Sequence, residues 1–510
     1  MSTPSNKATA RDWLGLSLLV FASLLIAADL SVLLFAIPDM SAQLAPSGPQ
    51  LLWIIDIYGF ALAGLLITMG TLGDRIGRRR LLMIGAGLFA TASLAAAFAP
   101  SAEMLIVLRA ALGIGGATMA PSTLGLIRNM FHDDRQRQTA IAIWTGGFAG
   151  GAGLGPILGG VLLQNFWWGS VFLVNLPAML LLLVAAPFLL PESKDPNPGR
   201  FDLLSVVLSM LAVLPTIYGI KELAAYGYAL LPTVSLVAGL VFALIFVLRQ
   251  RWLVVPLIDL KLFAVPSFTA AVLSNAIVMF AMLGISLYNV QYLLSVLGME
   301  PFPAALWSLA PALLVGVGIT AATMLSKSLP KHVLVAAGLV ISGVGMLLVG
   351  RLTIESGLFP FLAAAAVMTV GVGMVTALAN DMVMAAAPKE KAGAASALSE
   401  TGTELSGATG IAILGTIGAA VYHAAMSGMV PAGLPEAAKA AAESTLGGAM
   451  AVAAQLGGES GVALLANAQA AFMTAMSTTG SSAGLILVGS AVLVLLLSRR
   501  GRVPALSPAE

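Results

Sequence analysis

The chain has 510 residues, of which 59% are hydrophobic and 9% charged, and its formal net charge at pH 7 is +2. This near-neutral balance argues against nucleic acid as a partner, and the absence of cysteine from the sequence excludes disulfides and cysteine metal sites. The three histidines are scattered, so we expect no metal site and no cofactor. Apolar runs of about 20 residues recur along the chain, which predicts an all-α polytopic membrane protein.

The apolar runs predict fourteen membrane-spanning helices. The first run is too long for a signal-peptide core, so we expect it to be retained as a span. In chain order, the spans are expected near residues 13–37, 51–71, 81–99, 104–127, 139–163, 168–190, 203–221, 229–248, 267–296, 303–325, 332–350, 358–386, 392–425 and 472–498.

The positions of the 25 Lys and Arg residues support this count. Cytoplasmic connections of membrane proteins collect basic residues. With both termini in the cytoplasm, all basic residues fall inside except Lys221, Arg351 and Lys439, which we expect outside, and Arg109, which lies within a span. Removing one span would reverse the side of every later loop and destroy this bias.

The connections predict a 6 + 2 + 6 organisation. Residues 1–190 form an N-terminal six-helix half, and the polar, proline-rich segment 191–202 forms a cytoplasmic linker. Residues 203–250 form an inserted helix pair, and 251–510 form a C-terminal six-helix half. Within it, the long outside segment at about 426–471 is either a short amphipathic hairpin over the outer mouth or a mobile loop.

A repeat links the two halves. A shift of 254 residues places 137–156 on 391–410, so that a basic start is followed in both by a helix of small residues. In this register Glu400 and Glu404 fall opposite glycines of the first half. Parallel six-helix repeats around a central cavity are an architecture of secondary transporters.

Ionisable residues within the predicted spans are the candidate functional residues. An ionisable group at the bilayer centre costs about 2.5–3.5 kcal/mol, and Arg109 is the single base that we place in a span. A proton and a cation compete for a carboxylate in such surroundings, which is the chemistry of a proton/cation antiporter. Five acids lie in the predicted spans: Asp29, Asp56, Asp381, Glu400 and Glu404.

Each acid also has a structural explanation. Asp29 either couples protons or pairs with Arg109 as a lock, Asp56 could face the outer headgroups, and Asp381 could be a polar packing contact. The two glutamates, four residues apart on one helix face and without a nearby base, are the best candidates for binding protons or substrate. Aromatic side chains that could stack on a cation, or anchor the chain in the membrane, are Trp53, Tyr58, Trp144, Phe148, Tyr288 and Tyr292.

Three motifs resemble those of the major facilitator superfamily. The segment GTLGDRIGRRRLL (70–82) resembles the family's cytoplasmic loop motif, which acts as a conformational switch, with Gly70, Asp74, Arg75, Gly77, Arg78 and Arg79 in place. VLRAALGIGGATMAP (107–121) is similar to the fourth-helix motif, in which Arg109 would help to couple proton movement. GAGLGPILGG (151–160) resembles the fifth-helix motif of drug/proton antiporters, with Gly151, Gly155, Pro156, Gly159 and Gly160.

Across nearly its whole length, the chain resembles the 14-span drug/proton antiporter branch that exports quaternary ammonium compounds. The segments AADLSVLLFAIP, LLWIIDIY and SETGTEL carry this resemblance, whereas Ser399 and the apolar segment 309–318 depart from some of its members. It implies a multidrug efflux transporter in the bacterial cell membrane, not an enzyme, that exports lipophilic cations by alternating access as protons flow inward. We expect a monomer, because the cavity would close within one chain. Asp29, Asp56, Glu400 and Glu404 match acids of that branch. The alternative is a proton-coupled importer or exporter of a small metabolite on the same fold.

Overall fold

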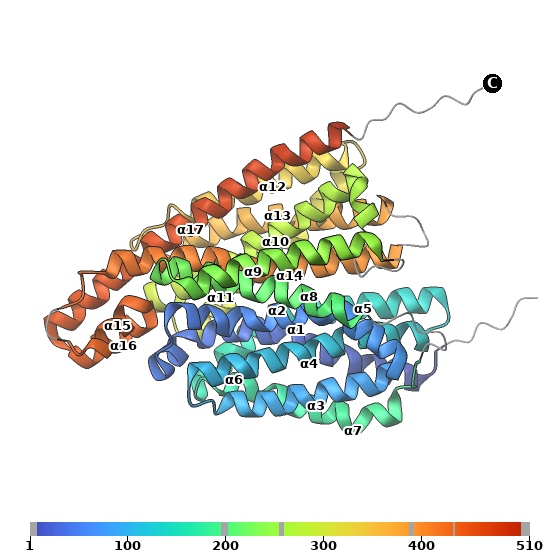
Figure 1. Cartoon of the computed structure of the whole chain (residues 1–510), viewed down its shortest axis with the longest axis horizontal. Coiled ribbons are helices and arrows are strands. Elements are labelled where there is room, and N and C mark those ends of the chain that lie inside the picture. Colours follow the sequence, from blue (N-terminus) through green and yellow to red (C-terminus); the bar gives the residue numbers. More distant parts are fainter. Residues whose placement is uncertain (1–7, 195–201, 254–259, 387–391, 432–433, 501–510) are drawn as a thin grey trace, which may run out of the picture.

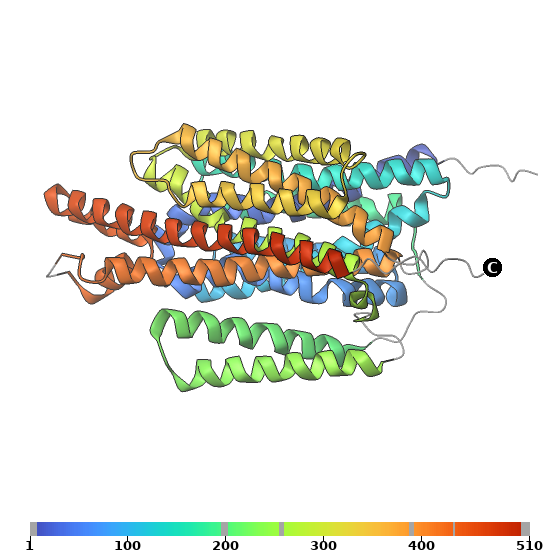
Figure 2. The same ribbon diagram turned by 90° about the horizontal axis from the view of Figure 1, so that it is seen from above.

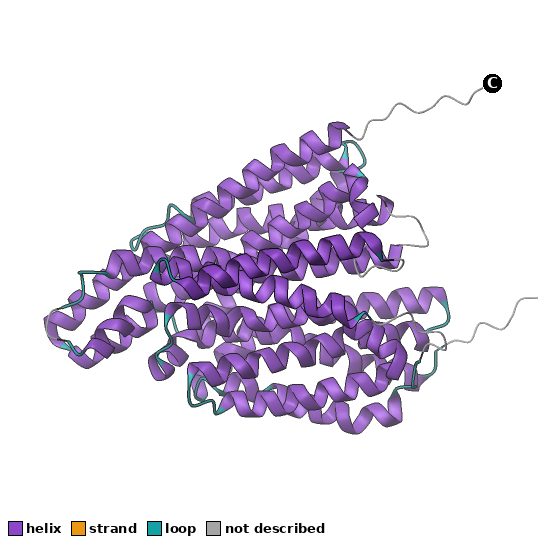
Figure 3. Cartoon of the chain, in the orientation of Figure 1, coloured by secondary structure: helices purple, strands orange, loops and turns teal. Residues whose placement is uncertain are grey.

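The computed structural model describes residues 8–194, 202–253, 260–386, 392–431 and 434–500. Every regular element in these ranges is helical, as Figure 3 shows. Fourteen of the described helices are long and apolar enough to cross a membrane. The prediction of an all-α membrane protein with fourteen spans is therefore confirmed.

The first seven helices make the N-terminal part of the bundle, drawn from blue to teal in Figure 1. Side-chain caps set where several of them begin: Thr9 and Asp12 form a capping box at the first, and Ser47 and Gln50 form another at the second. The helices are α1 (Ala10–Leu44), α2 (Gly48–Ile76), α3 (Arg78–Ala97), α4 (Ala102–Met130), α5 (Asp134–Asn165), α6 (Ser170–Leu173) and α7 (Asn175–Leu189).

A helical pair and the C-terminal part follow. The pair, α8 (Leu203–Tyr226) and α9 (Leu230–Trp252), lies beside the main bundle in Figure 2. The C-terminal part contains η1 (Leu260–Ala264), α10 (Pro266–Gln291), the π-helical turn η2 (Tyr292–Val296), α11 (Pro301–Leu325), α12 (Lys331–Val349), α13 (Leu358–Ala386), α14 (Ala392–Met426), α15 (Glu436–Ser444), α16 (Leu446–Leu456) and α17 (Gly458–Arg500).

Helix contacts repeat between the N-terminal and C-terminal parts. Helix α1 packs on α5 as α10 packs on α14, and α2 packs on α4 as α11 packs on α13. Helix α3 packs on α7 as α12 packs on α17, and the two parts meet through α2 with α14 and α5 with α11. Helices α5 and α14 are therefore equivalent, which agrees with the repeat between 137–156 and 391–410.

Buried apolar side chains form two large cores and one small one. One large core belongs almost entirely to α1–α7 and the other almost entirely to α10–α17. The small core joins Phe60 of α2, Ile217 of α8, and Ala408 and Ala412 of α14. The inserted pair is thus anchored on the seam where α2 meets α14.

The described part of the segment 426–471 contains two short helices, as in the hairpin alternative, and their place over the outer mouth stays a prediction. It contains α15 and α16, while its last part is the beginning of α17. Helix α16 packs on α1, where a Cβ on Gly447 would lie 2.9 Å from the Cβ of Ser41, and the Ser444 carbonyl lies beside Gly48 of α2. The hairpin therefore touches both halves at one end of the bundle; the terminal end, at which α1 begins and α17 ends, is the opposite one. Beside it lies a small, mainly apolar cavity of about 40 Å³, which Leu52 and Tyr288 help to line.

The expectation that Lys221 lies in an outside loop is wrong. Helix α8 continues to Tyr226, and the Lys221 side chain is fully buried. Arg109 is therefore not the single basic residue within a span. The sequence analysis counted Lys221 among the basic residues outside the membrane. Its partner in the membrane, Asp56, lies far away in the sequence and could not be recognised there.

Candidate functional site

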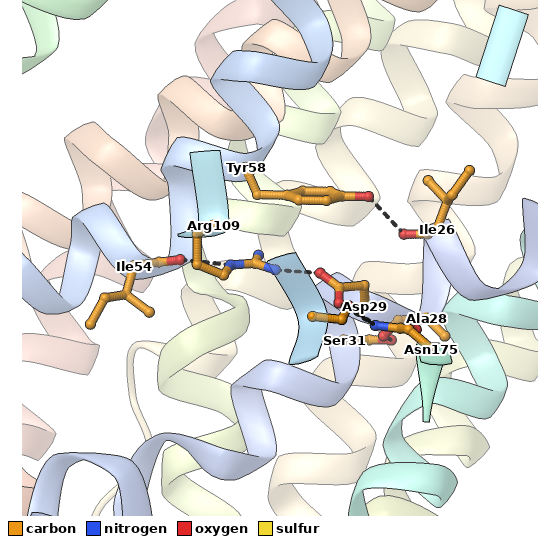
Figure 4. Close-up of polar contacts among 9 residues, drawn as sticks. Ile26, Ala28, Asp29, Ser31, Ile54, Tyr58, Arg109 and Asn175 are labelled. Carbon is orange, nitrogen blue, oxygen red and sulfur yellow. Dashed lines mark hydrogen bonds and ion pairs between the residues drawn. The ribbon is translucent and has the colours of Figure 1, made fainter. Parts of the chain in front are cut away.

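Arg109 of α4 is fully buried in the N-terminal half and contacts α1 and α2 there (Figure 4). Its guanidinium forms an ion pair and a hydrogen bond with the Asp29 carboxylate of α1. Its Nε donates to the Ile54 carbonyl of α2 at 3.0 Å, and its Cζ lies 4.6 Å from the centroid of the Tyr58 ring. Asn175 of α7 donates to the other Asp29 oxygen at 3.1 Å. We call this group the Arg109 centre.

The Arg109 centre is closed on itself. Arg109 has no exposed surface and the Asp29 side chain is 2% exposed. The Tyr58 hydroxyl donates to the Ile26 carbonyl at 3.1 Å, and Asn175 also donates to Ser93 of α3 at 3.3 Å. A buried charge is tolerated when it is paired and hydrogen-bonded, and this carboxylate is both. The geometry favours the locking role for Asp29, while its role in proton coupling stays a prediction.

Glu400 and Glu404 have very different surroundings. Glu400 is exposed and Glu404 is half-buried, and neither carboxylate has a hydrogen bond or ion pair with any residue that the structure describes. The same face of α14 carries Ala408 and Gly415 further along the helix. We call the two glutamates the α14 acid stripe.

The α14 acid stripe points toward the N-terminal half. Further along the same face, Gly415 meets Leu52 of α2, and a Cβ on Gly59 of α2 would lie 3.2 Å from the Cβ of Ala408. On the other side of the bundle, Gly160 of α5 approaches Phe302 of α11. These contacts close the end of the bundle opposite the termini. The two acids lie on the next turns toward the terminal end, where the structure gives them no partner.

Asp56 is placed on the seam between α2, α8 and α14. Its carboxylate is buried, and its Oδ2 lies 2.7 Å from the Lys221 Nζ of α8. The Nζ also lies 4.0 Å from the centroid of the Trp53 ring. Asp56 therefore has a base as its partner, which the sequence did not indicate.

Asp381 lies apart from the other candidate acids. It is near the end of α13, its side chain is 66% exposed, and its Oδ2 lies 3.4 Å from Lys331 Nζ of α12. Asn380 accepts a hydrogen bond from Asn275 of α10 at 3.2 Å, and Asn275 also donates to Thr403 at 3.4 Å. This polar contact between helices belongs to Asn380, and the coupling role of Asp381 stays a prediction.

The loop motif at 70–82 is held within the N-terminal half. Asp74 forms an ion pair with Arg78, whose Nη1 donates to the Pro121 carbonyl at 3.1 Å. Arg79 donates from its backbone to Glu192 at 3.0 Å. Gly77 has a φ of +111°, and a Cβ there would lie 2.6 Å from a Glu192 oxygen, so both backbone shape and space require glycine. Two motif residues remain. Gly70 lies beside the Pro121 side chain, and Arg75 lies in the last turn of α2.

The fifth-helix glycines bring α5 against α1. Gly151 faces the Leu24 backbone, a Cβ on Gly155 would lie 2.9 Å from the Ala28 carbonyl oxygen, and one on Gly159 would lie 3.4 Å from that of Val32. Pro156 is accommodated inside the helix, which runs without a break. The predicted flat face for close helix packing is therefore present, and it packs beside Asp29.

The candidate aromatic residues are mostly packed against protein. Tyr288 and Tyr292 are buried and donate to the carbonyls of Gly415 at 3.3 Å and Gly357 at 3.1 Å. Trp144 donates to Thr123 at 3.1 Å and stacks on Phe148, with ring centroids 6.3 Å apart. Of the six, Tyr58 and Trp53 are the two that lie over a cationic side chain, those of Arg109 and Lys221.

Three residues of these networks were missed from the sequence. Lys221 was assigned to a loop, Asn175 is a single amide in an apolar run, and Glu192 belongs to the segment read as a linker. The signals available were the presence of a base or an amide within an apolar helix, and an acid close after the sixth span. The partners lie 82 residues or more away in the chain, so local patterns could not identify them.

Comparisons with known proteins agree with the motifs. The family profile described as Major Facilitator Superfamily matches residues 19–411. The chain is 43% identical over 500 residues to the multidrug efflux pump LfrA of Mycolicibacterium smegmatis, covering 98% of this chain and 99% of that protein. It is 34% identical over 484 residues to the methyl viologen resistance protein SmvA of Salmonella typhimurium, covering 94% and 97% of the two chains.

The fold also matches solved transporter structures. A bacterial homologue of the human lysosomal transporter Spinster, in an inward-facing and unoccupied conformation, superposes with a TM-score of 0.69 and 17% identity. The match covers 98% of this chain and 100% of that one. At this level of identity the likeness concerns the fold alone.

Proposed function

The chain belongs to the Major Facilitator Superfamily and is a drug efflux transporter of the bacterial plasma membrane, and from this premise we propose that it exports lipophilic cations in exchange for protons. The cargo class includes quaternary ammonium antiseptics, ethidium-like dyes and related cationic drugs. The family consists of transporters that need no cofactor, so the work of coupling falls on side chains of the chain itself.

One observation carries the cation and proton parts of the proposal. The α14 acid stripe lies between the halves and has no basic partner among the described residues. Four other acids described above do have a basic partner: Asp29, Asp56, Asp74 and Asp381. A carboxylate without a counter-ion in low-dielectric surroundings binds either a proton or a cation. Glu404 and Glu400 are therefore the proposed site at which protons and cargo compete.

The relatives support the choice of cargo. The name of SmvA refers to resistance to methyl viologen, which is chemically a bis-quaternary dication, and that of LfrA refers to multidrug efflux. Two acids four residues apart suit an organic cation better than an anionic or neutral metabolite. We propose a monomer, because one chain supplies both halves and the acid stripe that lies between them.

We propose that transport proceeds by alternating access, and the packing of the two halves supports this. The halves meet at the end opposite the termini, which we propose to be the outer end, since the basic loops lie at the other. Protonation of the acids from outside would displace the cation, and release of the protons into the cytoplasm would restore the negative site. In this proposal, the ion pair between Asp74 and Arg78 is the conformational switch, and its state differs between the two conformations.

The test uses everted membrane vesicles with an imposed pH gradient. We expect wild-type protein to accumulate ethidium and a quaternary ammonium compound, and Glu400→Gln or Glu404→Gln to abolish the accumulation while the protein stays folded. Arg351→Gln, an exposed basic position outside the site, is the control and should transport normally. A wild-type protein that moves neither cation would contradict the proposal, and normal uptake by both glutamine variants would remove the acid stripe from it.

A further inference from the structure

Lys221 is a fully buried lysine on the inserted helix pair. Its Nζ lies 2.7 Å from the Asp56 Oδ2 and 4.0 Å from the Trp53 ring centroid. A carboxylate and the face of an aromatic ring are the two features with which proteins bind an alkylammonium group. The side chain of Lys221 is itself an alkylammonium, so α8 places a cation into a cation-binding site on α2.

The ammonium group is incompletely satisfied by the described residues. An ammonium has three donors, and the buried Lys221 Nζ makes no hydrogen bond of good geometry to any described residue, nor does either Asp56 oxygen. A buried ion pair with unfilled donors is seldom a net source of stability, because desolvation opposes the attraction. Stabilisation of the fold is therefore a poor explanation for this lysine.

The position of the pair connects it to the moving parts of the molecule. Helix α8 packs on both α2 and α14, and Ile217, one turn before Lys221, belongs to the small core with Phe60 and Ala408. Leu405, the neighbour of Glu404, packs against the same core. A rearrangement of α2 against α14 would therefore change how deeply α8 inserts Lys221.

We propose that Lys221 is a tethered competitor for cationic cargo: its ammonium occupies a cation subsite formed by Asp56 and Trp53, and this subsite accepts a small organic ammonium ion when Lys221 is withdrawn or removed. The choice of an organic ammonium ion as the ligand rests on the proposed function. It makes Lys221 a specificity-determining residue, because it decides whether Asp56 is open to a second cationic group in addition to the α14 acid stripe.

The test restores the missing fragment of the side chain. Lys221→Ala removes the atoms that correspond to n-propylammonium, so purified Lys221→Ala protein is titrated with propylammonium and its thermal unfolding midpoint is recorded. We expect a saturable rise of the midpoint that propan-1-ol does not produce. The double variant Asp56→Asn/Lys221→Ala should bind propylammonium at least about tenfold more weakly. Lys331→Ala, which removes the exposed partner of Asp381, is the matched control and should show no rise.

The outcomes separate this inference from the transport proposal, because the titration involves no transport. Absence of a saturable rise in folded Lys221→Ala, or an equal rise in Lys331→Ala, overturns the inference. If Lys221→Ala folds poorly, the yield of folded protein from membranes solubilised with propylammonium becomes the readout, and a yield that propylammonium leaves unchanged overturns it as well. A wild-type protein that fails to export ethidium would instead contradict the proposed function alone.

Discussion

The Arg109 centre and the α14 acid stripe both carry carboxylates on helices of the bundle, yet they differ in what surrounds them. Asp29 is buried, paired with Arg109 and hydrogen-bonded by Asn175. Glu404 is half-buried and has no polar partner among the described residues. A paired acid stabilises helix packing, whereas an unpaired acid remains available to a ligand. Acidic side chains thus have opposite surroundings in the two halves of the repeat, and we predict opposite uses for them.

Removal of Arg109 should have the largest effect on stability. Arg109→Met leaves the Asp29 carboxylate buried without its counter-ion, and we expect a loss of about 3–5 kcal/mol in the free energy of unfolding. The double variant Asp29→Asn/Arg109→Met should recover part of this loss, because no uncompensated charge remains. Chemical denaturation in detergent measures both. A single variant as stable as the exposed-site control Arg351→Met would show that the Arg109 centre does not hold the N-terminal half together.

The packing beside Asp29 should give the next largest effect. Gly155→Ala places a Cβ against the Ala28 carbonyl and Ser31 of α1, so we expect a loss of about 1–3 kcal/mol from overpacking. Gly153→Ala lies on the same helix with nothing within 4 Å of the added Cβ, and the better helix propensity of alanine should stabilise it slightly. Thermal midpoints of the two variants test this pair. Equal midpoints would mean that the α1 and α5 contact is not tight.

The α14 acid stripe should respond in the opposite way. Glu404→Gln breaks no ion pair among the described residues, so we expect the free energy of unfolding to change by less than about 0.5 kcal/mol. Cation uptake in everted vesicles should nevertheless fall by at least about tenfold. A strongly destabilised Glu404→Gln would show that this acid has a structural partner after all, and the contrast with Asp29 would disappear.

The sequence predicted the features that depend on local pattern or on the cost of burying charge. The fourteen spans follow from lengths of apolar helix, and the Asp29 and Arg109 pair follows because a lone intramembrane base needs an acid. Lys221 escaped because a lysine near the end of an apolar run looks the same whether it snorkels outward or turns inward. Its direction is decided by the packing of α8 on α2 and α14, which are helices far apart in the sequence. The contact between Glu192 and Gly77 was missed for the same reason, because these two residues are also far apart in the sequence.

The smallest effect is expected at Asp381. Its ion pair with Lys331 joins side chains that are 66% and 42% exposed, and exposed pairs contribute about 0.2–1 kcal/mol at most. We therefore expect Lys331→Ala and Asp381→Asn to leave the thermal midpoint nearly unchanged, and Lys331→Ala to accumulate ethidium at close to the wild-type rate. If Asp381→Asn alone lost uptake, the carboxylate would act in coupling independently of Lys331. Asp381 would then act together with Glu400 and Glu404. The property shared by the three acids would be accessibility to protons, not burial.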